Sequence, residues 1–232
     1  MTYGRHKDEM TRRACPPALD ELLVAHIEAE ARSFFRGAHG SHDWDHTERV
    51  LLLAMRIGKK EKADLTVVRL AAILHDIGRA EEDRTNGRVC HSRRGAELAR
   101  EILARHGVGR RTAARVVHCI LTHRFRRKAA PKTLEARVLY DADKLDSIGA
   151  VGIGRAFLFA GEVGARLHNK GVDIAKTKAY TREDTAFREF VVKLGRIKDR
   201  IHTSEGRRIA AERHRFMVAF FDRLHKETDG VL

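Results

Sequence analysis

The sequence has 232 residues, of which 43% are hydrophobic, 6% aromatic and 34% charged, and its formal net charge at neutral pH is +14. This length and hydrophobic content are ordinary for a folded domain with one substantial core or two small ones. No run of eighteen apolar residues and no signal-peptide pattern occurs, so we expect a cytoplasmic protein without a membrane partner.

The positive charge is spread along the chain and is not gathered in one arm. One local group falls in a segment that we expect to be a loop, and it consists of Arg124, Arg126, Arg127, Lys128 and Lys132. Three interpretations stay open, in decreasing order of preference: a solvated basic face, capture of an anionic substrate, and binding of a nucleic acid, whose counterions lysine and arginine displace.

The polar and charged residues 1–16 lead into a Pro-Pro pair and predict a flexible N-terminal segment. We expect one domain over residues 17–232, beginning with a packing helix over 19–35. The apolar residues of that helix recur at helical spacing and are Leu22, Leu23, Ile27, Phe34 and Phe35.

The next predicted helix begins near residue 44 and carries His46 on its buried side, because His46 shares a stripe with Val50, Leu53 and Ile57. Asp43 is expected to cap this helix, and His42 to line a site. Arg49 follows His46 by three residues and lies near the same face. Pairing with a buried carboxylate and contact with a phosphate are both open for Arg49.

Residues 64–78 read as an apolar helix, with Asp64 as its cap and Gly78 as a left-handed residue at its end. His75 shares the buried face of this helix, and Asp76 follows it directly. An imidazole beside a carboxylate suits a divalent transition metal. The alternative is that the pair only caps or hydrogen-bonds the helix end.

Residues 79–89 are polar and predict a loop, in which Glu81 or Glu82 is a candidate general base or simply a solvated carboxylate. Two helices follow, over residues 91–107 and 111–125. They carry three histidines that are candidates for a second metal or for phosphate binding, His91, His118 and His123.

A further helix precedes residue 147 and places Asp143 beside its buried face. Lys144 is a candidate phosphate cation, and Asp146 a candidate acceptor for a ligating histidine or a base. Gly149, Gly152 and Gly154 have no strand before them and are expected to permit close helix packing.

Residues 161–182 are polar and glycine-containing, and we interpret them as a mobile substrate flap. Two packing helices close the chain, one over residues 187–201 and one over residues 205–227. The sequence therefore predicts an all-α bundle of about eight to ten helices.

The order of His46, then His75 and Asp76, then Asp143 resembles the signature of the HD-domain metal-dependent phosphohydrolases. The stretches HDWDHTERV, LHDIGR and DADKLDSIGAVGIGRAF are similar to the small single-domain HD nucleotide pyrophosphohydrolases of bacteria and archaea. The tract EEDRTNGRVCHSRRGAELA, which contains His91, looks more like HD branches that carry extra histidines near the metal.

This resemblance implies an HD fold and one divalent metal on His46, His75, Asp76 and Asp143, with Mn expected first and Fe, Ni, Co, Zn or Mg as alternatives. A second ion is left open, with His91 and His123 as its best candidates and His118 third. The expected catalytic residues are Asp76, Arg79, Lys144 and Asp146. The expected substrate-binding residues are His42, Arg49, His91, His118, His123 and Lys193. Lys198 is the alternative to Lys193, and a solvated helix face is the alternative for both lysines.

The implied reaction is hydrolysis of a nucleoside or deoxynucleoside triphosphate to monophosphate and pyrophosphate by metal-activated water. The alternatives are a phosphomonoesterase or phosphodiesterase of the same fold, and a basic nucleotide-binding or nucleic-acid-binding protein with a vestigial site. The sequence leaves the oligomeric state open.

Overall fold

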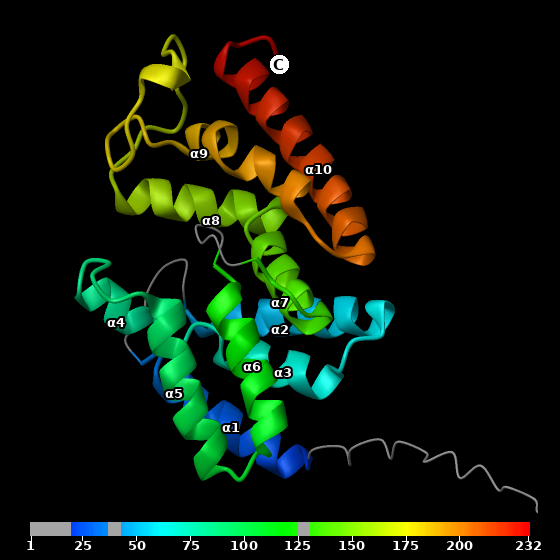
Figure 1. Ribbon diagram of the computed structural model, residues 1–232. Coiled ribbons are helices and arrows are strands. Elements are labelled where there is room, and N and C mark those ends of the chain that lie inside the picture. The colour runs from blue at the N-terminus through cyan, green and yellow to red at the C-terminus, as the bar shows by residue number, and fades with distance from the viewer. Residues whose placement is uncertain (1–19, 37–42, 125–129) are drawn as a thin grey trace, which may run out of the picture.

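The computed structural model describes residues 20–36, 43–124 and 130–232 (Figure 1). These residues form helices and connecting turns and contain no β-strand, which confirms the all-α prediction. The predicted flexible start, His42 and the basic residues Arg126, Arg127 and Lys128 lie outside the described residues. No helix in the described part of the chain is both long and apolar enough to cross a membrane.

The α-helices run in chain order as α1 (Glu21–Ser33), α2 (Trp44–Glu61), α3 (Leu65–Leu74), α4 (Arg79–Arg84), α5 (His91–Arg105), α6 (Arg110–Thr122), α7 (Leu134–Leu145), α8 (Gly149–Glu162), α9 (Ala186–Val192) and α10 (Ser204–Thr228). Two short 3-10 helices, η2 (Ile174–Lys176) and η3 (Leu194–Arg200), lie before and after α9.

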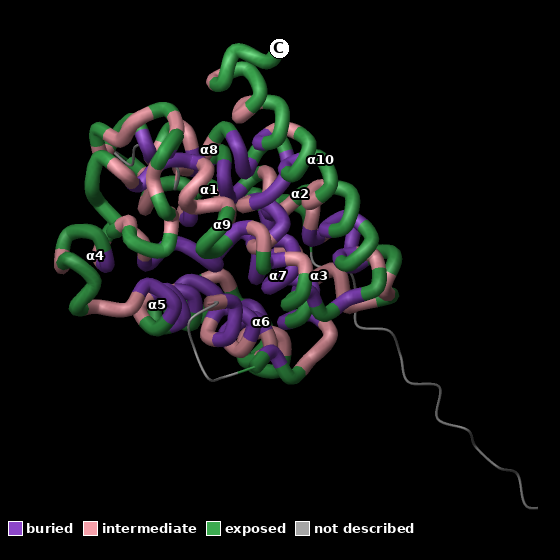
Figure 2. The backbone as a smooth tube through the Cα atoms, turned by 90° about the horizontal axis from the view of Figure 1, so that it is seen from above, coloured by how far each residue is buried: buried purple, intermediate pink, exposed green. Residues whose placement is uncertain are grey.

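Helices α2, α3, α6 and α7 pack on one another and form the centre of the bundle. Helix α5 lies against α6, and α8 and α10 cover the other end of α7 (Figure 1). Figure 2 shows the buried stretches converging on the middle of the molecule, whereas α10 turns a long exposed side outward. The candidate ligands of the sequence all lie in or at the ends of these central helices and of α5.

Side-chain caps fix where the two ligand-bearing helices begin. The Asp43 carboxylate accepts from the backbone N–H of His46 at 3.2 Å, and the Asp64 carboxylate accepts from the backbone N–H of Thr66 at 3.1 Å. Each satisfies a donor that the first helical turn leaves without a partner. Both predicted caps are confirmed, and the first of them sets His46 in the opening turn of α2.

Two segments differ from the sequence predictions. The predicted loop after residue 78 contains the short helix α4, which has no apolar stripe for periodicity to detect and is supported by Arg79 beside Glu82 at 3.2 Å. The predicted helix over residues 187–201 is broken at Lys193, whose φ of −139° separates α9 from η3. Gly195 lies just after this break, where its low helix propensity favours interruption.

Gly78 has a role other than the predicted left-handed helix end. Its φ is −89° and its ψ is 0°, so its backbone is right-handed. A Cβ added to Gly78 would lie 2.4 Å from the backbone oxygen of His91 and 2.6 Å from the backbone nitrogen of Gly95. The absence of a side chain therefore lets the turn after α3 approach the backbone of α5.

Gly78→Ala is expected to lower the free energy of unfolding by roughly 1 to 3 kcal/mol, because backbone atoms must shift to admit the methyl group. Gly154→Ala in α8 is the matched control, since its Cβ would meet no atom within 4 Å. The control should raise the stability by about 0.5 to 1 kcal/mol. Urea denaturation of both variants measures the difference, and equal stabilities would contradict this role of Gly78.

The first three glycines of α8, for which close packing was expected, differ from one another. Gly149 has a φ of +80°, and its Cβ would lie 2.8 Å from the Arg213 side chain of α10, so the expected close helix packing is confirmed there. The Cβ of Gly152 would instead lie 2.3 Å from the backbone oxygen of Ser147, in the turn before α8. Gly154 faces open space, so the packing prediction is wrong for that residue.

Candidate metal centre

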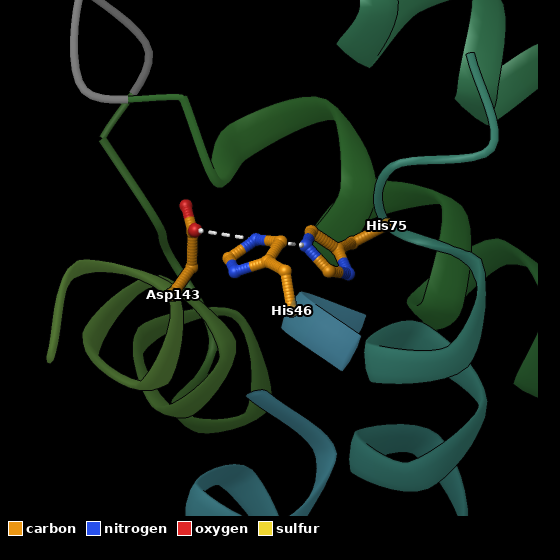
Figure 3. A group of neighbouring side chains, drawn as sticks. All are labelled: His46, His75 and Asp143. Carbon is orange, nitrogen blue, oxygen red and sulfur yellow. Dashed lines mark hydrogen bonds and ion pairs between the residues drawn. The ribbon is translucent and has the colours of Figure 1, made fainter. Parts of the chain in front are cut away.

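Three of the predicted ligands meet in one buried group. His46 comes from α2, His75 from the end of α3 and Asp143 from α7, with His46 between the other two (Figure 3). His46 Nε2 lies 3.4 Å from His75 Nε2 and 3.5 Å from Asp143 Oδ1. Two imidazoles and one carboxylate thus present ligand atoms to a common point.

A second buried group contains Asp76, His91 and His123. Asp76 Oδ1 lies 3.6 Å from His91 Nε2 and 3.5 Å from His123 Nε2. The other carboxylate oxygen of Asp76, Oδ2, lies 3.8 Å from Nε2 of both His46 and His75. Asp76 therefore stands between the two groups, with one oxygen facing each.

The orientation of the four imidazoles suits metal binding, because each Nδ1 faces an oxygen acceptor. Such a contact places the ring proton on Nδ1 and leaves the Nε2 lone pair free to ligate. The pairs are His46 with Asp146, His75 with the backbone oxygen of Ala72, His91 with Glu82, and His123 with the backbone oxygen of Ile120.

The charge states of His75, His91 and Asp76 point the same way. For His46, burial alone would lower the pKa, but its contacts with Asp143 and Asp146 outweigh burial and raise it. Burial lowers the pKa of His75 and of His91 to about 4, so both rings are neutral at neutral pH. Burial alone would raise the pKa of Asp76, but the Arg79 guanidinium and the nearby imidazoles lower it well below its usual value. Asp76 is therefore an anion at neutral pH.

The buried Asp76 Oδ1 has no hydrogen-bond donor in the described part of the chain. A buried carboxylate oxygen without a partner is costly, and a cation would satisfy it. Imidazole nitrogens together with carboxylate oxygens suit Mn, Fe, Co, Ni or Zn. The two groups therefore fit one or two divalent metal ions, with Asp76 available to both.

Asp146 supports the first group from outside. It is 1% exposed and lies 2.8 Å from His46 Nδ1, while it accepts from Arg49 Nε at 2.8 Å and from Arg155 Nη1 at 2.7 Å. Of the two alternatives for Arg49, the structure shows the pairing with a buried carboxylate. Asp146 acts as the acceptor that the sequence suggested.

Glu82 has the corresponding position behind the second group. Its buried carboxylate contacts His91 Nδ1 and also pairs with Arg79 at 3.2 Å and Arg124 at 2.9 Å. Glu81, which the sequence could not distinguish from Glu82, is half-buried and accepts from Arg94 at 2.8 Å. Glu81 and Glu82 therefore differ in burial and in the direction of their side chains, and both properties depend on the short helix α4.

Glu82→Gln is expected to lower the metal affinity of the Asp76, His91 and His123 group by roughly 10- to 100-fold, because the amide no longer fixes the His91 ring as a charged acceptor does. Glu81→Gln is the matched control and should leave the affinity unchanged. Titration of the metal-free protein with Mn²⁺, followed by calorimetry, measures both. An equal effect of the two substitutions would contradict this role.

Both groups lie at the wall of a cleft of about 1120 Å³. Its lining includes Asp76, His91, His123 and Asp143, and cations that surround them. The predicted cations Arg79, Lys144 and Lys193 line this cleft, as do Arg36, Arg124 and Arg155. Four aromatic residues complete the rim, Phe34, Phe35, Phe159 and Tyr180.

Two predicted substrate-binding residues lie elsewhere in the described chain. Arg49 is held by Asp146, and His118 is half-buried in α6 but is not among the residues that line the cleft. Lys144 lines the cleft, and its Nζ is 2.6 Å from Asp143 Oδ2. Sequence spacing gave no sign of the aromatic rim, because its members come from three distant segments.

Comparison with known proteins identifies a matching family model, a relative in sequence and a similar solved structure. The family model for the HD domain matches residues 43–148. The protein YpgQ of Bacillus subtilis (strain 168) is 37% identical over 209 residues, which are 88% of this chain and 93% of YpgQ. A crystal structure of YpgQ in complex with ADP has a TM-score of 0.70 and 35% identity, and the match covers 89% of this chain and 95% of that chain.

Two further similarities extend this result. A predicted HD superfamily hydrolase from an uncultured Thermotogales bacterium has a TM-score of 0.64 and 30% identity, covering 88% of this chain and 91% of that chain. Ribonuclease Y of Chloroflexus aurantiacus is 31% identical over 119 residues, which are 51% of this chain and 21% of that protein. The segment matched by the family model holds all six residues of the two groups. The chain belongs to the HD-domain superfamily of metal-dependent phosphohydrolases.

Proposed function

We propose that this hydrolase acts on nucleoside triphosphates, with ribose or deoxyribose, and releases the monophosphate and pyrophosphate. The observation that carries the proposal is the composition of the cleft, in which the two candidate metal groups share one space with six cations and an aromatic rim. The cations would bind the negatively charged triphosphate, and the aromatic side chains would contact the base. The crystal structure of YpgQ with ADP supports a nucleotide as the ligand.

His46, His75 and Asp143 on one side and His91 and His123 on the other would hold the metal, with Asp76 between them. Bound there, a divalent ion such as Mn²⁺ supplies Lewis acidity, which activates water and stabilises negative charge on phosphate oxygens. The chain contributes orientation through Asp146 and Glu82, whose contacts keep the Nε2 atoms of His46 and His91 directed at the other candidate ligands.

Arg79 and Lys144 are the cations closest to the candidate ligands. Arg79 Nη2 lies 3.4 Å from Asp76 Oδ2, and Lys144 Nζ lies beside Asp143. Fixed positive groups at the place where charge develops lower the barrier of phosphoryl transfer. Arg124, Arg155 and Lys193 extend this positive lining and would bind the remaining phosphate oxygens.

A phosphodiesterase is the second candidate, and the similarity to Ribonuclease Y favours it over a phosphomonoesterase. The same metal groups and cations serve attack on a phosphodiester. The length of the substrate distinguishes the two functions. A nucleotide would lie within the cleft, whereas an oligonucleotide would extend beyond it.

The test is turnover of a nucleotide panel by the Mn²⁺-loaded protein, with phosphate and pyrophosphate measured separately and a short oligoribonucleotide included. Metal-dependent release of pyrophosphate, lost in Asp76→Ala, would support the proposal. Cleavage of the oligonucleotide with intact triphosphates would favour the phosphodiesterase. Release of phosphate alone from monophosphates would identify a phosphomonoesterase.

A further inference from the structure

Tyr180 is an unusual residue at the rim of the cleft. It follows η2 in the segment that joins α8 to α9, and the residue is 78% exposed. Figure 1 shows this segment between the two helices. Its φ is +58°, in the left-handed region that a bulky side chain rarely adopts. The residue thus combines backbone strain with an aromatic ring that contributes little to the core.

Buried polar contacts hold the strained backbone in place. The backbone N–H of Tyr180 donates to Asp184 Oδ2 at 2.7 Å, and Asp184 is itself buried and accepts from Arg188 Nη1 at 2.7 Å. Asn169 adds a second tie, because its amide donates to the backbone oxygen of Glu183 at 3.0 Å. Strain that the surrounding structure maintains in this way is typical of functional positions.

The Tyr180 ring stands next to a second aromatic ring, Phe159 of α8. Their centroids are 5.8 Å apart and the ring planes meet at 77°. Both residues line the main cleft and also a smaller cavity of about 300 Å³. The two cavities meet at this aromatic pair, and Arg155 and Lys193 line both of them as well.

This arrangement indicates how a nucleotide would be oriented in the cleft. Arg155 contacts Asp146, which in turn contacts His46, and Arg155 also lines both cavities beside Phe159 and Tyr180, so it connects the first metal group to the aromatic pair. A nucleotide with its phosphates at the metal groups would place its base at that pair. The two carboxylates that line the smaller cavity are each paired with a cation, Asp184 with Arg188 and Glu189 with Lys193.

The other two aromatic residues of the cleft, Phe34 and Phe35, are less suited to a base. The Phe35 ring packs edge-on against Trp44, with centroids 5.4 Å apart, and Phe34 and Phe35 are half-buried against the core. Tyr180 offers a far more exposed ring, so a planar ligand can stack on it without displacing core contacts.

We propose that Tyr180 and Phe159 form a stacking platform for the base of the nucleotide, and that the site recognises the aromatic face of the base instead of its hydrogen-bonding edge. The platform rests on the proposed function in taking a nucleotide as the ligand of the cleft. Stacking accepts every base, because each has a π-face. Purines, which offer the larger face, bind more tightly than pyrimidines.

The test compares ADP with inorganic pyrophosphate, which lacks a base, as ligands of the Mn²⁺-loaded protein by calorimetry. Tyr180→Asn removes the ring and introduces a residue that tolerates the left-handed backbone. We expect this variant to weaken ADP binding by about tenfold or more and to leave pyrophosphate binding unchanged. Tyr180→Phe keeps the ring and should bind ADP like the wild type, and wild-type protein should bind ADP more tightly than CDP.

Phe216→Ala is the matched control, since it removes an exposed ring of α10 that lies outside both cavities. Unchanged ADP binding by Tyr180→Asn, or an equal loss of ADP and pyrophosphate, would overturn the platform. A larger loss of ADP affinity in Phe34→Ala than in Tyr180→Asn would place the base at Phe34 and would also overturn the platform. These binding constants are measured without turnover. A protein that hydrolyses no triphosphate but still binds ADP through Tyr180 would therefore refute the proposed reaction and leave the stacking platform intact.

Discussion

Asp76→Asn is expected to deplete divalent metal from both ligand groups at once and to reduce turnover by roughly 10³-fold, the equivalent of several kcal/mol of charge stabilisation. The reason is the position of Asp76, with Oδ1 within 3.6 Å of His91 and His123 and Oδ2 3.8 Å from His46 and His75. An amide keeps the shape of the side chain but cannot supply two anionic oxygens.

Elemental analysis of the metal-loaded proteins measures this effect, with the number of ions per chain as the readout. His118→Gln is the matched control, because His118 lies on α6 near His123 in sequence but outside the lining of the cleft. The control should keep the full metal content and turnover. Retention of the wild-type metal content in Asp76→Asn would show that Asp76 serves neither group.

Asp146→Ala is expected to lower the free energy of unfolding by roughly 3 to 5 kcal/mol, as when one partner of a buried ion pair is removed. The variant would leave Arg155 and the half-buried Arg49 without their shared carboxylate, and His46 Nδ1 without its acceptor. Because the His46 ring would then be free to turn, we also expect metal affinity to fall by roughly 10- to 100-fold.

Urea denaturation and Mn²⁺ titration measure the two effects separately. Asp222→Ala is the matched control, since Asp222 pairs with exposed Lys226 at 2.8 Å on α10 and should change stability by no more than about 1 kcal/mol. If Asp146→Ala were as stable as this control, the contacts of Asp146 would contribute no more to the free energy of unfolding than a surface ion pair does.

Acidification provides an independent check on Asp146. Burial raises the pKa of its carboxyl, but the contacts with His46 and Arg49 outweigh burial and lower it below the usual 3.8. A depressed pKa in the folded state gives stability that is present above 3.8 and is lost as the pH falls toward the lower, folded-state value. The wild type should therefore lose more stability than Asp146→Ala over that interval.

The sequence predicted those parts of the site that depend on local periodicity. His46 and His75 fall on the apolar stripes of α2 and α3, and both are buried as expected. Asp43 and Asp64 are residue types that cap helices, and both act as caps. Asp146 follows Asp143 by about one turn, so its approach to the same cleft follows from helix geometry.

Tertiary geometry determined the rest. The sequence assigned Asp76 to a set with His46, His75 and Asp143, whereas the structure groups it with His91 and His123 as well. That arrangement depends on how closely the turn at Gly78 approaches α5, which no single-helix pattern encodes. The position of Tyr180 is similarly fixed by contacts of a long irregular segment and not by any repeat in its residues.

The candidate ligands are distributed over α2, the end of α3, α5, α6 and α7, so nearly 100 residues separate the first from the last. An ion that binds only when these helices have docked acts on the folding equilibrium like a reversible crosslink. By mass action, a hundredfold excess over its dissociation constant adds about 2.7 kcal/mol to the stability of the native state. Melting temperatures recorded with a series of divalent ions would therefore rank the metals by affinity without any knowledge of the substrate.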